Sequence, residues 1–352
     1  SGHSISPGRF DQYMYPYYKA DLEAGKISPA FAQELMDCIW VKLNDLNKVR
    51  DAASAEGFAG YSLFQNLIAG GQTPDGVDAT NDLSFMCIQA TKHVLLPMPS
   101  FSVRVWNGTP HEFLIKAAEL TRTGVGLPAY YNDEVIIPAL LNRGLTMEDA
   151  RNYNIIGCVE PQAPGKTDGW HDAAFFNMCR PLELVMNSGA DKSGSEADGV
   201  QIGPKTTDIT AMKTFDEFFD AYKEQTNYML KLLVNADNAI DLAHAERCPL
   251  PFQSCMVEDC IGRGKSLQNG GAIYNFTGPQ GFGIANMTDA LYAVKTLVFE
   301  QKKLTMAELK EAVEHNFGED ISDTMAQTLT TKEISRLAAS GKPISENTIK
   351  ET

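Results

Sequence analysis

Apolar residues recur along much of this chain at the spacing of amphipathic helices. The clearest case begins at Ser28 and Pro29, which supply a helix cap and a first-turn proline, and apolar positions then follow three or four residues apart as far as Leu46. A second predicted helix, residues 111–123, is closed by Gly124. Further helices are predicted over residues 214–237, 287–300 and 305–318, and a short one begins at Thr146.

Short apolar runs separate the helices, and one of them leads into polar residues. Ile155 and Ile156 are followed by Gly157, and then by Cys158 and Glu160. An apolar run that stops at a glycine predicts a strand followed by a loop. Helices that alternate with such short strands are typical of an α/β fold with a largely parallel sheet.

The composition is that of a large globular protein. The 352 residues are 43% hydrophobic and 21% charged, which allows a sizeable core. The formal net charge of -15 disfavours nucleic acids and anionic membranes as partners, because both would repel the protein. No apolar run approaches the roughly 20 residues of a membrane-spanning helix.

The cysteines are scattered without regular spacing. They are Cys38, Cys87, Cys158, Cys179, Cys248, Cys255 and Cys260. An odd number of scattered cysteines argues against a disulfide framework and predicts a reducing, cytoplasmic location. There is no Cys-x-x-Cys pair, and no histidine stands at ligand spacing near Cys255 and Cys260, so no metal site is predicted.

Cys158 and Glu160 are the most suggestive pair of chemical groups. A cysteine can act as a nucleophile, a metal ligand or a hydrogen-atom donor, and a glutamate two residues later can accept a proton from a substrate hydroxyl. A loop at the end of a strand is a common place for catalytic groups. Taken alone, however, this spacing fits better with a buried cysteine beside a solvated glutamate.

The wider sequence around this pair favours the catalytic interpretation. The segment Gly157-Cys158-Val159-Glu160-Pro161 resembles the cysteine loop of the glycyl radical enzymes, the pyruvate formate-lyase-like superfamily. Further matching segments, in one register along most of the chain, are Gly2-His3-Ser4, Gly8-Arg9-Phe10-Asp11-Gln12-Tyr13, Phe64-Gln65-Asn66, Gly70-Gly71-Gln72, Asn132-Asp133-Glu134, Gly165 to Asp172, Ala243 to Arg247 and Asn275 to Gly281. Within the family, the chain is most similar to the coenzyme-B12-independent glycerol and 1,2-diol dehydratases.

The resemblance implies a ten-stranded α/β barrel with helices outside and the catalytic cysteine on an interior loop. We expect residues 1–318 to form part of this barrel and residues 319–352 to be a polar C-terminal extension. An interior position would keep a radical away from water and oxygen, and it would strengthen polar contacts to the substrate. Cys158 and Glu160 are therefore expected to open onto one cavity.

The resemblance also implies a cofactor and partners. Family members store a radical on a glycine in a C-terminal motif of the Arg-Val-x-Gly-Tyr type, where a radical S-adenosylmethionine (SAM) activating enzyme installs it, and they bind no other cofactor directly. The sequence lacks this motif, since residues 102–106 share letters with it but precede the cysteine. We therefore expect an internal fragment, inactive and poorly stable alone, of a homodimeric enzyme from the cytoplasm or from a bacterial microcompartment.

The roles of individual residues follow from the resemblance to the dehydratases. Cys158, as a thiyl radical, would remove a hydrogen atom from the carbon that bears one hydroxyl, and Glu160 would take the proton of that hydroxyl. His3 and Asp172 fall at positions that contact or protonate substrate hydroxyls, and Ser4 would add a hydrogen bond. Two alternatives remain open, namely a frayed terminal residue for His3 and a helix cap for Asp172.

Phe64 stands where we expect a diol dehydratase to carry a tyrosine that contacts the substrate. The missing hydroxyl removes a hydrogen bond of about 0.5–1.5 kcal/mol, which favours propane-1,2-diol over glycerol. The valine that follows Cys158 argues against formate-lyase chemistry, which uses two adjacent cysteines. Two alternatives remain: another eliminase, of the choline trimethylamine-lyase or isethionate sulfite-lyase type, or a non-catalytic fragment that only completes a partner chain.

Overall fold

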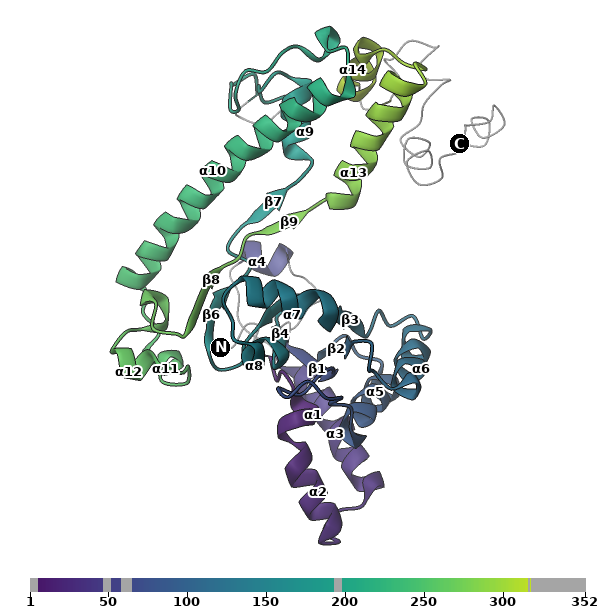
Figure 1. Ribbon diagram of the computed structural model, residues 1–352, viewed down its shortest axis with the longest axis vertical. Helices are drawn as coiled ribbons and strands as arrows, with labels where there is room; N and C mark the ends of the chain where they lie inside the picture. The colour runs from purple at the N-terminus through teal and green to yellow at the C-terminus, as the bar shows by residue number, and fades with distance from the viewer. Residues whose placement is uncertain (1–5, 47–51, 58–64, 193–197, 316, 318–352) are drawn as a thin grey trace. The chain divides into compact units, whose positions relative to one another are not determined.

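The structure is a computed structural model that describes residues 6–46, 52–57, 65–192, 198–315 and 317. The chain forms two compact units. One consists of Ser1–Gly169 with Pro249–Phe276, and the other consists of Trp170–Cys248 with Thr277–Thr352. Figure 1 labels the helices and strands of both units.

The first unit is built around a three-stranded parallel sheet. Strand β1 (Asn66–Gly70) pairs with β2 (Ser100–Val105), which in turn pairs with β3 (Ala129–Asn132). Parallel neighbours need a crossover connection, and the helices α5 (Asp82–Val94) and α6 (His111–Thr121) supply it. The α/β fold class predicted from the sequence is confirmed.

Different elements cover the two faces of this sheet. Successive strand residues point to opposite faces. Leu67 therefore joins a core with α5, α6 and α3 (Pro29–Asp45), whereas Ile68 packs among residues of α7 (Asp133–Asn142) and α8 (Met147–Arg151). Helices on both faces of a parallel sheet make this a layered α/β unit.

An antiparallel hairpin lies on the same face of the sheet as α7 and α8. Its strands are β4 (Asn154–Ile156) and β5 (Glu160–Gln162), and β4 contacts β1. The buried side chains of Tyr153 and Ile155 belong to the same core as Ile68. The hairpin base is thus packed onto the sheet, while its tip is formed by the residues between the two strands.

Short elements complete the first unit. They are α1 (Phe10–Tyr13), α2 (Tyr15–Glu23), α4 (Ala52–Gly57), α11 (Pro251–Ser254), α12 (Cys260–Arg263) and the 3₁₀ turn η2 (Leu267–Asn269). Strands β6 (Thr167–Trp170) and β8 (Tyr274–Thr277) form a two-stranded sheet where the chain passes between the units.

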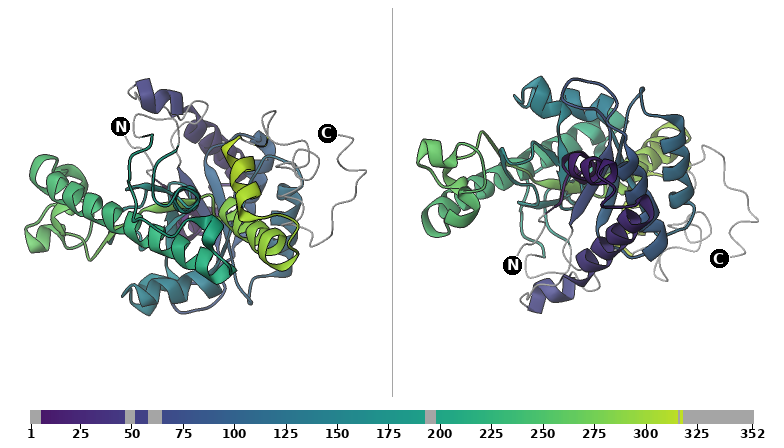
Figure 2. Two further views of the ribbon diagram at one scale, coloured as in Figure 1. Left: turned by 90° about the horizontal axis from the view of Figure 1, so that it is seen from above. Right: turned by 90° about the horizontal axis from the view of Figure 1, so that it is seen from below.

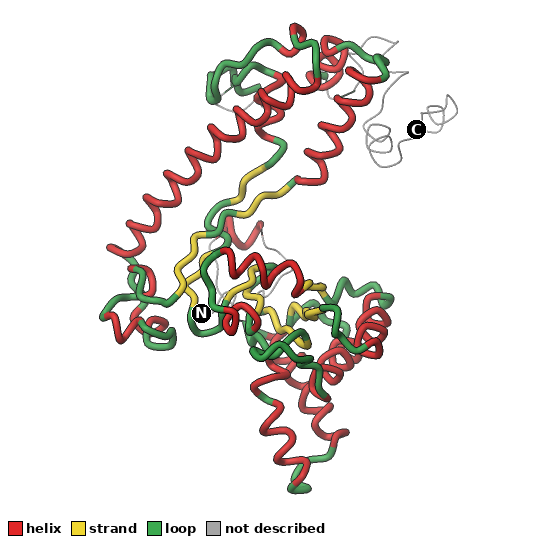
Figure 3. The backbone as a smooth tube through the Cα atoms, viewed as in Figure 1, coloured by secondary structure: helices red, strands yellow, loops and turns green. Residues whose placement is uncertain are grey.

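The second unit is mainly helical. Strand β7 (Phe175–Asn177) pairs in parallel with β9 (Gln280–Phe282), and the two strands run side by side in Figure 3. Its helices are α9 (Arg180–Met186), η1 (Ile209–Ala211), α10 (Phe215–Arg247), α13 (Ile284–Ala293), the π-helical η3 (Val294–Glu300) and α14 (Met306–Glu314). Helix α10 (green) is one continuous rod in the left view of Figure 2. The core of this unit includes Phe218 and Leu297.

The predicted helices are present, although some of their boundaries differ. Ser28 caps α3 by accepting a hydrogen bond from the Phe31 N–H group. Helix α10 continues past its predicted end at residue 237 to Arg247. No glycine or proline interrupts this stretch until Pro249, and a proline disfavours helical backbone at the residue before it.

Two helices near the C-terminal end differ from prediction. The helix expected over residues 287–300 begins at Ile284, and from Val294 it continues as a π-helix. The helix expected over residues 305–318 has the predicted Thr305 capping box but ends at Glu314. Among the described residues, no helix is sufficiently long and apolar to cross a membrane.

Candidate active site

The hairpin tip holds the two residues that the sequence singles out. Ile156 pairs with Glu160, so the tip consists of Gly157, Cys158 and Val159. Gly157 has a φ of 59°, in the left-handed region that glycine adopts without strain. The predicted strand end at Gly157 is confirmed, but Glu160 is the first residue of a second strand and does not belong to the loop.

The carboxylate of Glu160 lies against the backbone of the tip. It accepts a hydrogen bond of 2.8 Å from the Val159 N–H group. Cys158 is exposed in the described structure, and Glu160 is half-buried. The expected shielding of Cys158 is therefore not supplied by the described residues themselves, because the sheet supports the hairpin at its base and does not enclose its tip.

A buried ion pair anchors the base of the hairpin to the sheet. Arg104, on β2, binds Asp133 at two points: Nε lies 2.8 Å from Oδ1 and Nη2 lies 2.8 Å from Oδ2. Arg104 also donates from Nη1 to the main-chain oxygen of Tyr153 at 3.1 Å, and its guanidinium lies 3.9 Å from the centre of the Tyr153 ring. The Tyr153 hydroxyl donates to Asp133 at 2.8 Å. Burial raises the pKa of Tyr153 well above its usual value, so this hydroxyl stays a donor.

Two further buried charged residues, Arg9 and Asp11, support the end of β1. Arg9 donates to the Gly70 carbonyl at 3.2 Å, while Asp11 accepts from the Gly70 N–H group at 2.8 Å and from the Ser84 hydroxyl at 2.6 Å. Burial lowers the pKa of Arg9 to about 10 and raises that of Asp11. The two side chains thus bind both the carbonyl and the N–H group of Gly70, the last residue of β1.

A cavity of about 530 Å³ lies beside the hairpin base. Its lining includes Asn154, Ile156 and Gln162 from the hairpin, with Ser6 and Arg9 from the N-terminal segment. Cys158 and Glu160 are not among the described residues that line it. That Cys158 and Glu160 open onto a common cavity stays a prediction.

Of the remaining predicted site residues, three lie outside the described residues and one belongs to the other unit. His3, Ser4 and Phe64 lie outside the described residues. Asp172 belongs to the second unit, where it is exposed in a turn ahead of β7. This turn does not begin a helix, so the helix-cap alternative for Asp172 is wrong. The substrate-binding roles of all four residues stay predictions.

Sequence reasoning missed one residue that contacts the tip. The Tyr131 hydroxyl, on β3, donates to the main-chain oxygen of Cys158 at 3.0 Å. Burial, followed by the charges of Glu160 and Cys158, raises the pKa of Tyr131 to about 12. The alternation of residues along β3 could have placed this side chain on one face of the sheet. It could not have shown that the side chain contacts the hairpin tip, which follows later in the chain.

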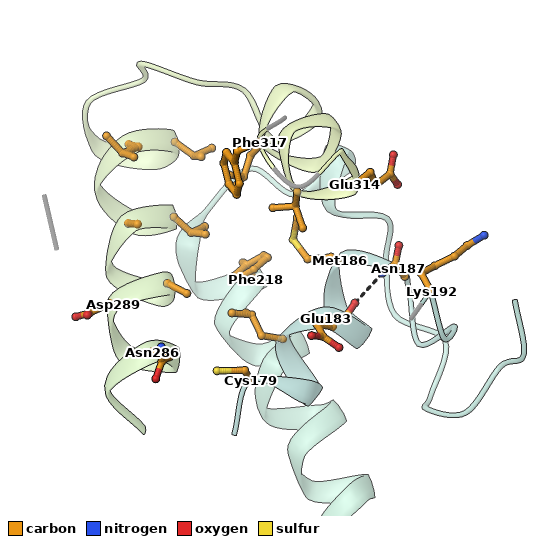
Figure 4. A pocket seen from close by; sticks show the side chains of 18 of the residues that line it. Cys179, Glu183, Met186, Asn187, Lys192, Phe218, Asn286, Asp289, Glu314 and Phe317 are labelled. Atoms are coloured by element: carbon orange, nitrogen blue, oxygen red, sulfur yellow. Dashed lines mark hydrogen bonds between the residues drawn. The ribbon is translucent and has the colours of Figure 1, made fainter. Parts of the chain in front are cut away.

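The second unit contains a separate cavity of about 680 Å³ (Figure 4). Phe218 and Met186 belong to its largely apolar wall, and Cys179 also lines it. The Cys179 thiol donates to the Gly283 carbonyl at 3.6 Å, and burial raises its pKa, so the reactive thiolate is disfavoured there. Among the described parts of the chain, no cluster of three or more His, Cys, Asp or Glu side chains could hold a metal ion.

Comparison with known proteins identifies relatives over most of the chain. The profile of the family described as pyruvate formate lyase-like matches residues 1–338. The (2S)-3-sulfopropanediol dehydratase of Klebsiella oxytoca is 39% identical over 322 residues, which are 90% of this chain and 38% of that protein.

Two solved structures are also similar. One, described as 1,2-propanediol dehydration in Roseburia inulinivorans, is 63% identical with a TM-score of 0.84, over 96% of this chain and 44% of that one. The glycerol-bound B12-independent glycerol dehydratase of Clostridium butyricum is 57% identical with a TM-score of 0.82, over 96% of this chain and 43% of that one. The chain thus spans less than half the length of these relatives. It belongs to the pyruvate formate-lyase-like family of glycyl radical enzymes.

Proposed function

We propose that this chain supplies the cysteine hairpin of a radical dehydratase that converts a small 1,2-diol to an aldehyde. The observation that carries the proposal is the tip itself, where an exposed Cys158 thiol and the Glu160 carboxylate flank a single residue, Val159. The likeness at 63% and 57% identity to proteins of propanediol and glycerol dehydration supports the substrate class.

The exposed position of Cys158 suits a thiol that must meet a second loop. In this family a radical SAM activating enzyme installs a radical on a glycine, and that radical supplies the unpaired electron with which Cys158 begins each turnover. The sequence here contains no glycine motif of this kind. The activating enzyme and a second copy of the complete protein are the proposed partners.

Cys158 and Glu160 then divide the chemistry between them. The Cys158 thiyl takes a hydrogen atom from the substrate carbon that bears one hydroxyl, which forms S–H and leaves a carbon radical. Glu160 takes the proton of that hydroxyl, and the added negative charge drives loss of the neighbouring hydroxyl. This hydroxyl leaves as water after it gains the proton that Glu160 took, and the product radical recovers a hydrogen atom from Cys158. The sum is a diol converted to an aldehyde and water.

A neutral diol is favoured over a sulfonate. A sulfonate needs arginine partners, and the two arginines described beneath the hairpin, Arg9 and Arg104, are buried and bound to protein groups. Phe64, which we propose to line the substrate pocket, would leave one wall apolar. Propane-1,2-diol is therefore the proposed substrate, ahead of glycerol, and the other eliminase chemistries are the alternative.

The test replaces the matching segment of the full-length Roseburia inulinivorans protein with this chain. The hybrid is activated anaerobically by a radical SAM enzyme and given propane-1,2-diol, glycerol, choline and isethionate in turn. Aldehyde from the diols, and none from a Cys158→Ala hybrid, is the expected result. Trimethylamine or sulfite without aldehyde would establish the eliminase alternative, and a folded hybrid without any product would favour a non-catalytic role.

A further inference from the structure

A run of hydrogen bonds begins and ends at the Gly157–Cys158 dipeptide. At its first end, the Gly157 N–H group donates to the Ser6 hydroxyl oxygen at 3.0 Å. The same oxygen accepts the Asn66 N–H group of β1 at 3.1 Å. The N-terminal side of the tip is therefore tied to the first strand of the sheet through one serine.

The run returns to the tip through the other two strands. The Asn66 side chain donates from Nδ2 to the Ser102 hydroxyl oxygen of β2 at 2.9 Å, and the Ser102 side chain hydrogen-bonds to the phenol of Tyr131 on β3. The Tyr131 hydroxyl then donates to the Cys158 main-chain oxygen at 3.0 Å. Asn66 and Ser102 are fully buried, so exchange of these bonds for bonds to water is costly.

This arrangement restrains the tip at both sides of its cysteine. Gly157 by itself would let the loop rotate, because glycine has a wide choice of backbone angles. With the N–H of Gly157 and the carbonyl of Cys158 both held, the main freedom left to the thiol is rotation of its own side chain. Tyr131 on β3 holds one side directly, and Asn66 on β1 holds the other through Ser6. Packed strands are more rigid supports than loops.

We propose that Tyr131 is a positioning residue for the Cys158 thiol. Its hydroxyl holds the Cys158 carbonyl and so sets the direction in which the thiol leaves the hairpin, while Ser6 holds the opposite side of the same dipeptide. The catalytic part of this role rests on the proposed function, in which the Cys158 sulfur takes a hydrogen atom from a substrate carbon. Such a transfer depends on close approach of the sulfur to that carbon. A misplacement of about 1 Å can lower a rate by about 100-fold.

The state of the phenol suits this role over a wide pH range. Burial and the neighbouring Glu160 and Cys158 raise the pKa of Tyr131 to about 12, so the hydroxyl keeps its proton and remains a donor. The proton is directed to the carbonyl at 3.0 Å. Tyr131 thus acts through the backbone and takes no part in the proton transfer assigned to Glu160.

The chain offers a matched control on the same strand. Tyr130 precedes Tyr131, and its hydroxyl is 2.8 Å from that of Thr121, on α6 and away from the tip. Tyr130→Phe and Tyr131→Phe therefore remove the same atom from neighbouring residues. Ser6→Ala is a second test variant, because it removes the acceptor of the Gly157 N–H group.

The first measurement is amide hydrogen exchange of residues 154–162 in the 352-residue chain. Loss of one hydrogen bond shifts local opening by about 2- to 12-fold, so exchange at the tip should speed up by this factor in Tyr131→Phe and Ser6→Ala. Tyr130→Phe should match the unsubstituted chain, and thermal melting of Tyr131→Phe should stay close to that of Tyr130→Phe. Equal exchange at the tip in the two tyrosine variants would overturn the proposal.

The second measurement is steady-state kinetics in the activated hybrid enzyme. Tyr131→Phe should lower kcat by about tenfold or more with little change in KM, whereas Tyr130→Phe should leave both constants unchanged. An unchanged kcat for Tyr131→Phe in an active hybrid would overturn the catalytic part of the role. If the unsubstituted hybrid is inactive, the proposed function fails, and the exchange measurement alone decides whether Tyr131 holds the tip.

Discussion

The guanidinium of Arg104 meets the carboxylate of Asp133 at two points, each 2.8 Å long, and neither side chain has any solvent exposure. Such a pair requires good geometry and further hydrogen bonds to offset the cost of removing two charges from water. Both conditions are met here, since Tyr153 donates to Asp133 and accepts from Arg104 through its carbonyl. The pair therefore ties the residue just ahead of the cysteine hairpin to the sheet.

Asp133→Asn should destabilise the protein strongly. The change leaves the buried Arg104 charge without its partner, a loss that typically costs about 3–5 kcal/mol. The free energy of unfolding from urea titration is the measurement. The control is Asp45→Asn, which breaks an exposed pair with Lys42 of 3.0 Å and should change stability by less than about 1 kcal/mol. Equal losses in the two variants would contradict this account of the ion pair.

Gly157→Ala should strain the tip. An L-residue in the left-handed region costs about 1–2 kcal/mol, and Gly157 has a φ of 59°. Gly25→Ala is the control, because Gly25 has a φ of 65°, open space around its Cα and a position away from the hairpin. Both variants should lose similar stability by urea titration, but only Gly157→Ala should lower aldehyde formation in the hybrid enzyme. Comparable activity in both would show that tip geometry is not limiting.

The stability supplied by Asp149 should vanish in acid. Although burial acts to raise its pKa, hydrogen bonds from Lys166 and Tyr274, each 2.6 Å, with one from Thr146, lower the pKa of Asp149. A carboxylate with a lowered pKa in the folded state stabilises the protein above its unfolded pKa of about 3.9. This stabilisation is lost as the pH falls through the folded value.

The comparison of Asp149→Asn with the unsubstituted chain tests whether the stabilisation by Asp149 is lost toward low pH. The difference in free energy of unfolding should be constant from about pH 5 to 8 and should shrink as the pH falls below about 4. A difference that grew toward low pH would mean that Asp149 is stabilised in its protonated form.

Phe64→Tyr should shift specificity toward glycerol. A restored hydroxyl could supply one hydrogen bond, so the ratio of kcat/KM for glycerol to that for propane-1,2-diol should rise by about 2- to 12-fold in the hybrid enzyme. Tyr130→Phe, at a strand position away from the tip, is the control and should leave the ratio unchanged. A ratio unaffected by Phe64→Tyr would remove Phe64 from the proposed substrate pocket.

Local signals in the sequence were enough to find most elements. Ser28 with Pro29, and Thr305 with Glu308, mark helix starts that the structure confirms, because a cap depends only on neighbouring residues. The strand before Gly157 was also predicted from neighbouring residues alone, because a short apolar run there stops at a glycine. The change to a π-helix at Val294 was not, since no glycine or proline marks it.

The parts of the site that were missed depend on contacts distant in sequence. Along β2, Phe101 and Val103 alternate with Ser102 and Arg104, a pattern typical of a strand with one solvated face. The structure instead buries both polar side chains beneath the hairpin. Nothing local to β2 indicates that a hairpin some fifty residues later covers that face, so neither the Arg104 pair nor the Ser102–Tyr131 link was predictable from spacing.

The transfer of deuterium through Cys158 tests the central claim most directly. The activated hybrid enzyme is given propane-1,2-diol with two deuterium atoms on the carbon that bears the primary hydroxyl, and the aldehyde is analysed by mass spectrometry. If Cys158 removes one deuterium and returns it to the neighbouring carbon, the propanal carries both deuterium atoms, and a Cys158→Ser hybrid of equal stability forms none. Propanal from the Cys158→Ser hybrid at a comparable rate would contradict the account, because an alcohol hydroxyl cannot replace the thiol in this transfer.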